Sequence, residues 1–464
     1  MTTYDLVVVG AGPGGYVCAI RAAQMGMKVA LVEQQSTLGG TCLNVGCIPS
    51  KALLESSERV AMVHNQLASH GITVGDVSVD LATLMQRKTT IVKELTDGLA
   101  MLMKKNKVDV VQGTGTLERA GLVSVAGPGE RQSLEAKAVC LAMGSEPMKL
   151  GCAPFDGKYV VSSTEALCFD TVPKRLLVIG AGALGLELGS VWLRLGSEVT
   201  VVEMLDTIVP GGDAQMLKVL HKSLVAQGFV LRLGTQVLST RVQDNEVKVT
   251  IRRGDADPEQ LCVDRVLVGI GRRARVDSAG IEQAGVLVER GRVVINDRFE
   301  TSVPGVYAIG DLVRGPMLAH KASEEGVALA ELLAGNSPSV GYHAMPAVVY
   351  TEPEYGVVGL SEQQAKEQGI AYKTGKCWYQ ANGRAKSLGD QQGLVKLLAD
   401  SASGRLIGAH IVGTRASELI GELSLAMRMG ATVQDIAATI HPHPSLSELI
   451  KEAALAVNRS AIHS

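Results

Sequence analysis

The sequence predicts an α/β fold with two Rossmann-like dinucleotide-binding units and a C-terminal α+β unit. The first observation is a buried-strand pattern over 4–9 that leads into a glycine-rich turn, a helix and a second strand. The second is that this pattern returns from 175 onward, and in both copies an acidic residue closes the second strand, 23 positions after the first glycine. The third is a boundary rich in glycine, serine and proline at 335–338, after which antiparallel strands and helices follow.

The remaining elements follow from apolar periodicity and from glycine and proline positions. A helical stretch with apolar residues three and four apart precedes a strand-rich segment that ends at 142–144, and short strands separate the second glycine-rich unit from the boundary at 335–338. Helices are expected at 16–26, 50–106, 319–333, 417–429 and 447–457, and further strands at 28–33, 198–203, 347–350, 394–399 and 406–412.

Length and composition fit a chain of about three globular domains. The chain has 464 residues, 46% of them hydrophobic, and a net charge of −2, so bulk electrostatics would recruit neither nucleic acid nor an anionic membrane. No apolar stretch approaches the roughly 20 residues of a membrane helix. Because Tyr4 already opens a strand, no leader is expected ahead of the fold, and the protein is expected to be cytoplasmic. The 8 cysteines are too few and too irregularly spaced for a secreted disulfide framework, and no metal site is expected.

Each glycine-rich turn predicts a diphosphate-binding site. Glycine lets the backbone approach the phosphates, the following helix presents free N–H groups, and the distal carboxylate accepts hydrogen bonds from a ribose. A lone turn could serve tight helix–strand packing instead, but each copy has the strand, helix and acid of the dinucleotide fingerprint. The residues are Gly10, Gly12, Gly15 and Glu33 in the first copy and Gly180, Gly182, Gly185 and Glu203 in the second.

Two such sites predict two cofactors. The first is the candidate FAD site, because a pair of cysteines follows it directly, and the second is expected to hold a nicotinamide nucleotide. Glu203 favours NAD over NADP, since a 2′-phosphate would meet a carboxylate and no arginine lies between Glu203 and Gly212 to receive it.

Cys42 and Cys47 are the candidate redox residues. They lie five positions apart in a segment where Asn44 and Gly46 tolerate a tight loop. A disulfide at this spacing requires a distorted helix start, and a strained disulfide is easily reduced. Pro49 suits a first helical position, which would place Cys47 just before a helix N-terminus, where the pKa of a thiol is lowered. The alternative is a pair of buried structural thiols. A structural role is the interpretation that we favour for the other six cysteines, which lie singly in apolar runs or loops.

The segment 39–51 resembles the active-site signature of the dihydrolipoamide dehydrogenase family, within the pyridine nucleotide–disulfide oxidoreductases. The resemblance covers essentially the whole chain and includes the segments 179–189, 269–272, 307–311 and 317–321. It implies FAD and NAD as cofactors. It also implies that Cys47 lies nearest the flavin in a charge-transfer pair and that Cys42 exchanges with the substrate.

The resemblance implies further cofactor contacts. Lys51 would lie beside N5 of the flavin and pair with Glu187 of the NAD unit, and Asp311 would bind the ribitol of FAD. Met143 stands where the family often has threonine, which leaves one contact on the flavin side open. The remaining implied contacts are Gly115, Gly144 and Ala319 for FAD and Gly271 for NAD.

A histidine and a glutamate five positions apart, His443 and Glu448, are the candidate base and its orienting group. A dithiol must lose a proton before it attacks a disulfide, and a histidine oriented by a carboxylate is the usual base. Ser445 and Glu448 also have the spacing of a capping box, so helix capping is the alternative role for Glu448. The segment resembles the family's His-x-His-Pro-Thr-x-x-Glu, with Pro442 and Ser445 as departures that remove neither group. In that family the two residues reach the disulfide from the neighbouring subunit, which implies a homodimer.

Four segments are expected. They are an FAD-binding domain with the redox disulfide (1–150), an NAD-binding domain (151–271), a segment that completes the FAD domain (272–345) and a dimerisation domain (346–464). The resemblance implies oxidation of protein-bound dihydrolipoamide through a Cys42–Cys47 disulfide and FAD, with hydride transfer to NAD⁺. The implied partner is a lipoylated acyltransferase of a 2-oxo acid dehydrogenase complex or the carrier protein of glycine cleavage.

Two alternatives stay open. The first is a glutathione- or mercuric-type reductase that uses NADPH, against which Glu203 and a C-terminus without a second cysteine pair count. The second is a redox sensor without enzymatic activity, in which the cysteine pair switches a partner interface and His443 would be superfluous.

Overall fold

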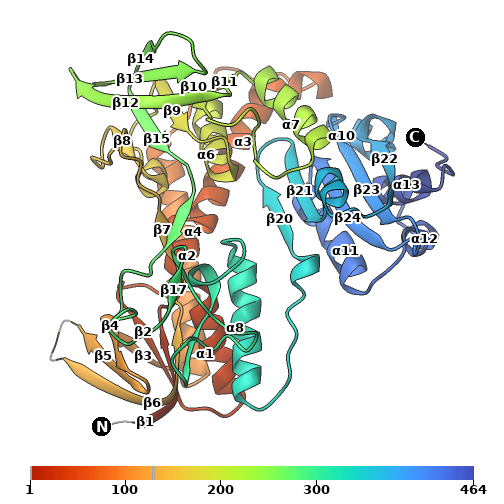
Figure 1. Cartoon of the computed structure of the whole chain (residues 1–464). Coiled ribbons are helices and arrows are strands. Elements are labelled where there is room, and N and C mark those ends of the chain that lie inside the picture. Colours follow the sequence, from red (N-terminus) through yellow and green to blue (C-terminus); the bar gives the residue numbers. More distant parts are fainter. Residues whose placement is uncertain (1–2, 128, 130, 464) are drawn as a thin grey trace. The chain divides into compact units, whose positions relative to one another are not determined.

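The computed structural model describes residues 3–127, 129 and 131–463. The chain separates into two compact units (Figure 1). Unit 1 consists of Met1–Ala52, Thr83–Met148 and Gly271–Val340, and unit 2 consists of Leu53–Ala82, Lys149–Ile270 and Gly341–Ser464. The segment 53–82 thus groups with unit 2, although it lies inside the expected first domain. The expected bounds of the four segments stay predictions.

The core of unit 1 is a sheet whose strands come from separate parts of the chain. They are β1 (Thr3–Val9), β2 (Val29–Glu33), β3 (Asp109–Gln112), β4 (Thr114–Arg119), β5 (Leu122–Ala126), β6 (Gln132–Leu141) and β19 (Val306–Ala308). The spatial order is β3-β2-β1-β6-β5-β4, and β19 also pairs with β6. The pairings of β1 with β2 and β6, of β2 with β3 and of β6 with β19 are parallel. Because parallel strands are buried on both faces, the runs 6–9 of β1 and 29–32 of β2 are apolar and buried.

Helices and short elements complete unit 1. The helix α1 follows the first glycine-rich turn and lies beside α8, as Figure 1 shows. The helix α3 begins in unit 1 and ends in unit 2. The bounds are α1 (Pro13–Gln24), α2 (Gly40–Val45), α3 (Cys47–Asn65), α4 (Leu81–Lys105), β7 (Ser145–Pro147), β16 (Arg272–Ala274), β17 (Val288–Glu289), β18 (Arg292–Val293), η2 (Gly310–Leu312) and α8 (Ala319–Leu333).

Unit 2 repeats the glycine-rich architecture. Its parallel sheet has the order β11-β10-β9-β15-β8, and a separate antiparallel sheet has the order β12-β13-β14. The bounds are β8 (Val160–Val161), α5 (Ser163–Ala166), β9 (Arg175–Ile179), α6 (Ala183–Arg194), β10 (Glu198–Val202), α7 (Ala214–Ala226), β11 (Val230–Arg232), β12 (Thr235–Gln243), β13 (Glu246–Arg253), β14 (Glu259–Val263) and β15 (Arg265–Val268). A 3-10 turn, η1 (Leu67–His70), follows α3 in the same unit.

The C-terminal part of unit 2 is an antiparallel sheet packed against helices, in the order β20-β21-β24-β23-β22. One helix, α13, packs on β22 and β23, and α11 packs on β21 and β24. The bounds are η3 (Tyr342–Ala344), β20 (Pro346–Val349), β21 (Glu354–Gly359), α9 (Glu362–Glu367), β22 (Tyr372–Trp378), η4 (Tyr379–Ala381), α10 (Gly383–Leu388), β23 (Leu394–Asp400), β24 (Leu406–Gly413), α11 (Ala416–Arg428), α12 (Val433–Ala438) and α13 (Glu448–Val457). Within 3–127, 129 and 131–463, no helix combines the length and apolar character that crossing a membrane requires.

One expected element was wrong. The helical stretch expected at 50–106 is two helices, α3 and α4, separated by η1 and by a segment without regular secondary structure at 72–80. The residues between the helices, 66–80, include two glycines and several β-branched residues, which disfavour a helix, and the apolar periodicity on either side concealed the break.

Candidate active site

The first glycine-rich turn has the shape that a diphosphate requires. Gly10 has φ +103°, and a Cβ there would lie 2.5 Å from the carbonyl oxygen of Ala142. A Cβ on Gly15 would lie 1.8 Å from the carbonyl oxygen of Gly10, so this glycine allows α1 to approach the strand. The space beside Gly12 is open, since no atom lies within 4 Å of a Cβ placed there. Because α1 has no side-chain cap and no acidic residue in its first turn, its N–H groups suit an anionic ligand.

The second turn repeats this geometry. Gly180 has φ +104°, a Cβ on Gly185 would lie 2.1 Å from the carbonyl oxygen of Gly180, and the space beside Gly182 is open. The helix α6 likewise lacks a side-chain cap and an acidic first turn. The residues of both turns therefore fit the diphosphate of a dinucleotide, which is the cofactor class expected from the sequence.

The two acids that close the second strands make matching hydrogen bonds. Glu33 accepts from the N–H of Ala11 at 2.8 Å through Oε2 and from that of Gln35 at 2.9 Å through Oε1. In the second copy, Glu203 accepts from Ala181 at 2.8 Å and from Leu205 at 2.9 Å. Each carboxylate is thus fixed beside its glycine-rich turn and keeps lone pairs for the hydroxyls of a ribose.

The candidate redox cysteines lie on either side of a break between two helices. Cys42 belongs to α2, Cys47 is the first residue of α3, and Gly46 separates the helices with φ −141° and ψ −113°. Cys47 therefore opens the helix, whereas the sequence placed it just before the N-terminus. The prediction failed because Pro49 is the third residue of the helix and not the first. Proline is tolerated throughout the first turn of a helix, since the N–H that it lacks would have no partner within the helix there.

The side chains of Cys42 and Cys47 are hydrogen-bonded to one another, and the disulfide expected between them stays a prediction. This hydrogen bond, together with burial, raises the pKa of the Cys42 thiol well above its ordinary value, although the charge of Lys51 opposes the shift. The two side chains therefore lie within hydrogen-bond distance of each other.

The loop that begins the redox segment packs directly onto the first glycine-rich turn. The N–H of Gly39 donates to the carbonyl of Ala11 at 2.9 Å, and a Cβ on Gly40 would lie 2.6 Å from the Cα of Gly12. Asn44 holds the segment in place, since its Nδ2 donates to the carbonyl of Gly40 at 2.9 Å. The chain thus brings the cysteine pair next to the candidate FAD site, within unit 1.

Asp311 lies in a polar cluster that also reaches α2. Its Oδ2 accepts from the hydroxyl of Ser145 at 2.5 Å, and Arg272 Nε donates to the same hydroxyl at 2.7 Å. Arg272 also contacts Thr41 at 3.4 Å, and its burial lowers its pKa. Ser145 and Arg272 were not predicted as partners of Asp311, although each directly follows a predicted glycine.

Other predicted cofactor contacts lie at chain positions that suit backbone contacts. Gly115 is buried on β4, where a Cβ would come within about 3.0 and 3.1 Å of Val9 and Val32, near the ends of β1 and β2. Gly144 follows β6 with φ +71°, and Ala319 is the first residue of α8. Their contacts with FAD stay predictions.

Glu187 and Gly271 lie on the expected nicotinamide side. Glu187 is buried on α6 and accepts from the N–H of Tyr350 at 3.0 Å, so it joins α6 to the end of β20 within unit 2. Gly271 has φ +108° and precedes β16. The expected pairing of Glu187 with Lys51 stays a prediction.

His443 and Glu448 form the expected pair in unit 2. His443 Nδ1 lies 2.9 Å from Glu448 Oε1, and the imidazole side chain is 81% exposed. Glu448 Oε2 accepts from the N–H of Ser445 at 2.9 Å, and this bond, with the contact to His443, holds the pKa of the carboxyl below its ordinary value. Of the two hydrogen bonds of the capping box that the sequence suggested, the one from the Ser445 N–H to Glu448 is therefore present. The Ser445 hydroxyl bonds Ser447 instead of capping α13. The carboxylate performs both tasks.

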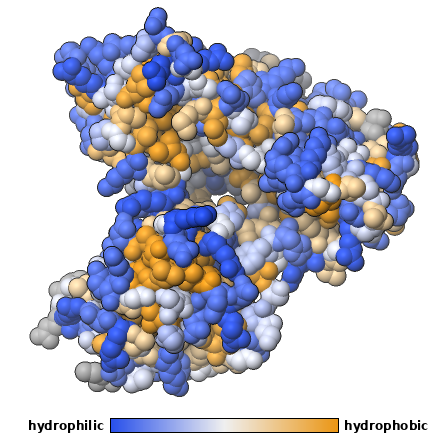
Figure 2. All heavy atoms as spheres, viewed as in Figure 1, coloured by the Kyte–Doolittle hydropathy of each residue, from blue (hydrophilic) through white to orange (hydrophobic). Residues whose placement is uncertain are grey.

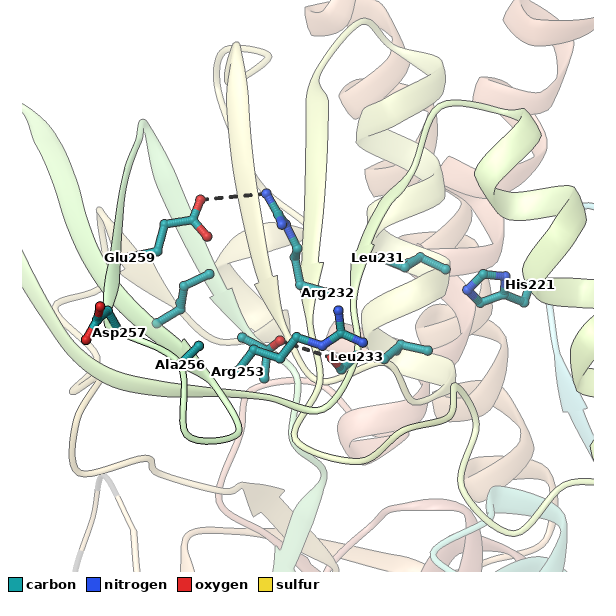
Figure 3. A pocket seen from close by; sticks show the side chains of 10 residues that line it. His221, Leu231, Arg232, Leu233, Arg253, Ala256, Asp257 and Glu259 are labelled. Atoms are coloured by element: carbon teal, nitrogen blue, oxygen red, sulfur yellow. Dashed lines mark hydrogen bonds and ion pairs between the residues drawn. The ribbon is translucent and has the colours of Figure 1, made fainter.

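A cavity of about 400 Å³ lies elsewhere in unit 2, beside β11, β12 and β13 (Figure 3). Arg232 NH2 lies 3.6 Å from Glu259 Oε1, and Arg253, Asp257 and His221 also line the cavity. None of its lining residues belongs to a glycine-rich turn. Because two arginines are balanced by two carboxylates, the lining favours neither an anion nor a cation.

Comparison with protein families agrees with this geometry. The family model described as pyridine nucleotide-disulphide oxidoreductase matches residues 4–326, and the dimerisation-domain model of the same family matches residues 345–454. The chain belongs to the pyridine nucleotide-disulphide oxidoreductases. The resemblance of the 39–51 segment to this family is thereby confirmed, as is the expected fold class.

Relatives of this oxidoreductase match it along its whole length. A protein named dihydrolipoyl dehydrogenase, mitochondrial, from Pisum sativum is 46% identical over 463 residues, which cover 99% of this chain and 92% of the relative. Dihydrolipoyl dehydrogenase 3 of Pseudomonas putida is 46% identical over 465 residues, with 100% of both chains covered. Among solved structures, LpdA of Mycobacterium tuberculosis has a TM-score of 0.90 at 27% identity and covers 98% of this chain and 99% of its own.

Proposed function

We propose that this oxidoreductase oxidises the dithiol of protein-bound dihydrolipoamide and passes the electrons to NAD⁺ by way of FAD. The observation that supports this most is the loop of Cys42 and Cys47, two hydrogen-bonded thiols whose segment packs on the first dinucleotide turn. Full-length relatives with the name dihydrolipoyl dehydrogenase support the substrate. Glu203 beside the second turn supports NAD, because its carboxylate would repel the 2′-phosphate of NADP.

The cysteine pair begins the cycle as a disulfide. A substrate thiolate attacks the sulfur of Cys42, the Cys42–Cys47 bond breaks, and its electron pair leaves with Cys47 as a thiolate. The second substrate thiol then loses its proton and attacks the substrate sulfur of the mixed disulfide, which closes the lipoamide ring and leaves Cys42 reduced. The substrate has lost two electrons and the cysteine pair has gained them.

The chemistry that FAD supplies when bound is acceptance of these two electrons and their delivery as a hydride to NAD⁺. The residues proposed to hold it are those of the first glycine-rich turn, Glu33, Lys51 and Asp311, with backbone contacts from Gly115, Gly144 and Ala319. The second turn, Glu187, Glu203 and Gly271 are proposed for NAD. What the chain itself provides is orientation: the Gly39 and Gly40 backbone keeps the redox loop on the FAD turn.

His443 is the proposed base for the substrate thiols. If its Nδ1–H donates to Glu448, as the 2.9 Å separation allows, Nε2 keeps a lone pair that can take a proton. Glu448 orients the ring and stabilises the imidazolium that forms. In the proposed enzyme, His443 and Glu448 act at the cysteine pair of the neighbouring subunit of a homodimer.

The proposed partner is a lipoylated acyltransferase of a 2-oxo acid dehydrogenase complex or the carrier protein of glycine cleavage, since each presents the same dithiol. A cytoplasmic location is likewise proposed. The relative from Pisum sativum is named as a mitochondrial protein, so the names of the relatives do not decide the location.

Replacing Cys42 tests the function directly. Cys42→Ser is expected to abolish the oxidation of dihydrolipoamide, because the mixed disulfide cannot form, while some oxidation of NADH by artificial electron acceptors remains. Cys262→Ser, at an exposed cysteine outside the redox loop, is the matched control and is expected to retain full activity. Steady-state production of NADH from dihydrolipoamide is the measurement, and full activity in Cys42→Ser would overturn the proposal. A parent protein without such turnover would favour the redox sensor.

A further inference from the structure

A buried lysine–glutamate pair lies at the start of α8. Lys321 and Glu325 are one helical turn apart, and the side chain of each is 1% exposed. Lys321 Nζ lies 3.0 Å from Glu325 Oε1 and 3.1 Å from Oε2. Burial of two charges is expensive unless their attraction and further hydrogen bonds offset it, so the other partners of this pair matter.

Both side chains bind the same residue, Gly310. Glu325 Oε2 accepts from the N–H of Gly310 at 2.7 Å, and Lys321 Nζ donates to the carbonyl oxygen of Gly310 at 3.0 Å. Gly310 opens η2 with φ +71°, in the left-handed region that favours glycine. The ion pair therefore holds both backbone polar groups of the residue that immediately precedes Asp311.

The rest of Asp311 is fixed from other directions. Arg292 of β18 donates to the backbone carbonyl of Asp311 at 2.6 Å, and Ser145 donates to its carboxylate. Without Lys321 and Glu325, Gly310 could rotate the whole turn, because glycine has little intrinsic preference for one backbone conformation. The ion pair is thus a constraint on the N-terminal side of Asp311, in addition to the hydrogen bond from the N–H of Ile309 to the carbonyl of Leu141 at 3.1 Å.

We propose that Lys321 and Glu325 are positioning residues for FAD. They fasten η2 to the first turn of α8, and so set the distance between Asp311 and Ala319, which lies two residues before Lys321. The inference rests on the proposed function, in which Asp311 and Ala319 contact FAD. The further hydrogen bonds that this buried pair needs go to both backbone groups of the single residue before Asp311, and buried pairs can often be replaced by neutral side chains without loss of stability.

Two variants and one control test the proposal in the full-length holoprotein. Glu325→Gln removes the negative charge with little change of shape, and Lys321→Met combined with Glu325→Gln removes both charges together. Glu324→Gln alters the exposed neighbour of Glu325 and is the matched control. FAD release after dilution is followed by the recovery of free-flavin fluorescence, and the visible circular dichroism of bound flavin reports its surroundings.

Both test variants are expected to release FAD about 10-fold faster or more and to alter the visible dichroism, as loss of a supporting hydrogen-bond partner does at other cofactor sites. Glu324→Gln is expected to match the parent, and NAD binding should be unchanged in all three proteins. If Glu325→Gln fails to fold, the doubly substituted protein, which leaves no unpaired charge, decides. Parent-like FAD release and dichroism in that protein would overturn the inference. A parent protein that holds no FAD would overturn the proposed function instead.

Discussion

Glu448 uses each of its two carboxylate oxygens for a different purpose. Oε2 accepts from the backbone N–H of Ser445, and Oε1 lies beside Nδ1 of His443. Both contacts favour the ionised carboxyl, which is why its pKa lies below the ordinary value. Glutamine has the same shape but a single acceptor oxygen, so it can accept only one of these two hydrogen bonds.

Glu448→Gln is therefore expected to damage the base without removing it. If the amide oxygen accepts from Ser445, the amide nitrogen faces His443 Nδ1 and donates to it, so that the ring proton moves to Nε2 and the lone pair needed for catalysis is lost. The kcat for dihydrolipoamide oxidation should fall about 100-fold or more. Oxidation of NADH by an artificial acceptor, which requires no thiol deprotonation, should be retained.

Ser447→Ala is the control for this substitution, because among the described residues the Ser447 side chain bonds the Ser445 hydroxyl alone, and its loss leaves the Ser445 N–H in place. The effect is measured by the steady-state kinetics of two reactions: the oxidation of dihydrolipoamide by NAD⁺ and the oxidation of NADH by the artificial acceptor. Equal losses with dihydrolipoamide and with NADH would point to a general structural defect and contradict the proposed role of Glu448.

At the scale of elements, the two glycine-rich turns make separable predictions. A Cβ on Gly15 would lie 1.8 Å from the carbonyl oxygen of Gly10, and one on Gly185 would lie 2.1 Å from that of Gly180. Each alanine must push its helix away from the strand, so Gly15→Ala should weaken the binding of FAD and Gly185→Ala that of NAD. Gly98→Ala on α4, where a Cβ meets nothing within 4 Å, is the control. Flavin content and NADH titration measure the two effects, and loss of the same cofactor in both variants would contradict the assignment.

A second ion pair joins α7 to the C-terminal sheet within unit 2. Lys396 of β23 is 0% exposed, and its Nζ lies 2.7 Å from Oδ2 of Asp213, which is 2% exposed and caps α7. Burial opposes ionisation of Asp213, but the bond with Lys396 and nearby positive charge hold its pKa below the ordinary value. Since the folded-state pKa is lowered, the stabilisation is complete above the unfolded value of about 3.9 and is lost as the pH falls through the folded value.

Asp213→Asn is expected to lower the free energy of unfolding of unit 2 by about 1–3 kcal/mol at pH 7, because Lys396 loses one of its two carboxylate partners and keeps the other, Glu362. The difference from the parent should shrink below about pH 4. Both tryptophans, Trp192 and Trp378, lie in unit 2, so their fluorescence in urea titrations reports that unit. Glu55→Gln breaks the exposed pair with Arg59 and should cost less than about 1 kcal/mol. A parent and Asp213→Asn with the same urea midpoint at pH 7 would refute this account.

Local sequence patterns predicted the elements better than the contacts between them. The strand and turn of each glycine-rich unit and the helix over 319–333 were all expected, because a buried strand, a glycine turn and a helical apolar period each have a local signal. The contact of Lys396 with Asp213 spans 183 positions and has no such signal. The hydrogen bonds of Lys321 and Glu325 to Gly310 were not predicted either, because a lysine and a glutamate four positions apart normally indicate an exposed helix face.

At the scale of the whole molecule, apolar side chains remain exposed on the C-terminal part of unit 2. Leu425, Met429 and Ile440 are 64%, 76% and 93% exposed, and Figure 2 shows hydrophobic atoms among hydrophilic ones on this part of the surface. The dimerisation-domain family model matches residues 345–454, which include all three. These residues support the proposed homodimer, since burial of exposed apolar side chains against a partner subunit is favourable.

A mixture of two inactive variants tests whether each active site draws on both subunits. Cys42→Ser lacks the exchanging thiol and His443→Ala lacks the base, so neither homodimer should turn over dihydrolipoamide. In a hybrid dimer, a site shared between subunits combines both lesions in one place and leaves the other site intact. Random re-assortment makes half of the dimers hybrid, so about one quarter of the parent activity should return after the two proteins are unfolded and refolded together. If His443 served the cysteines of its own subunit, every site would keep one lesion and refolding would restore nothing.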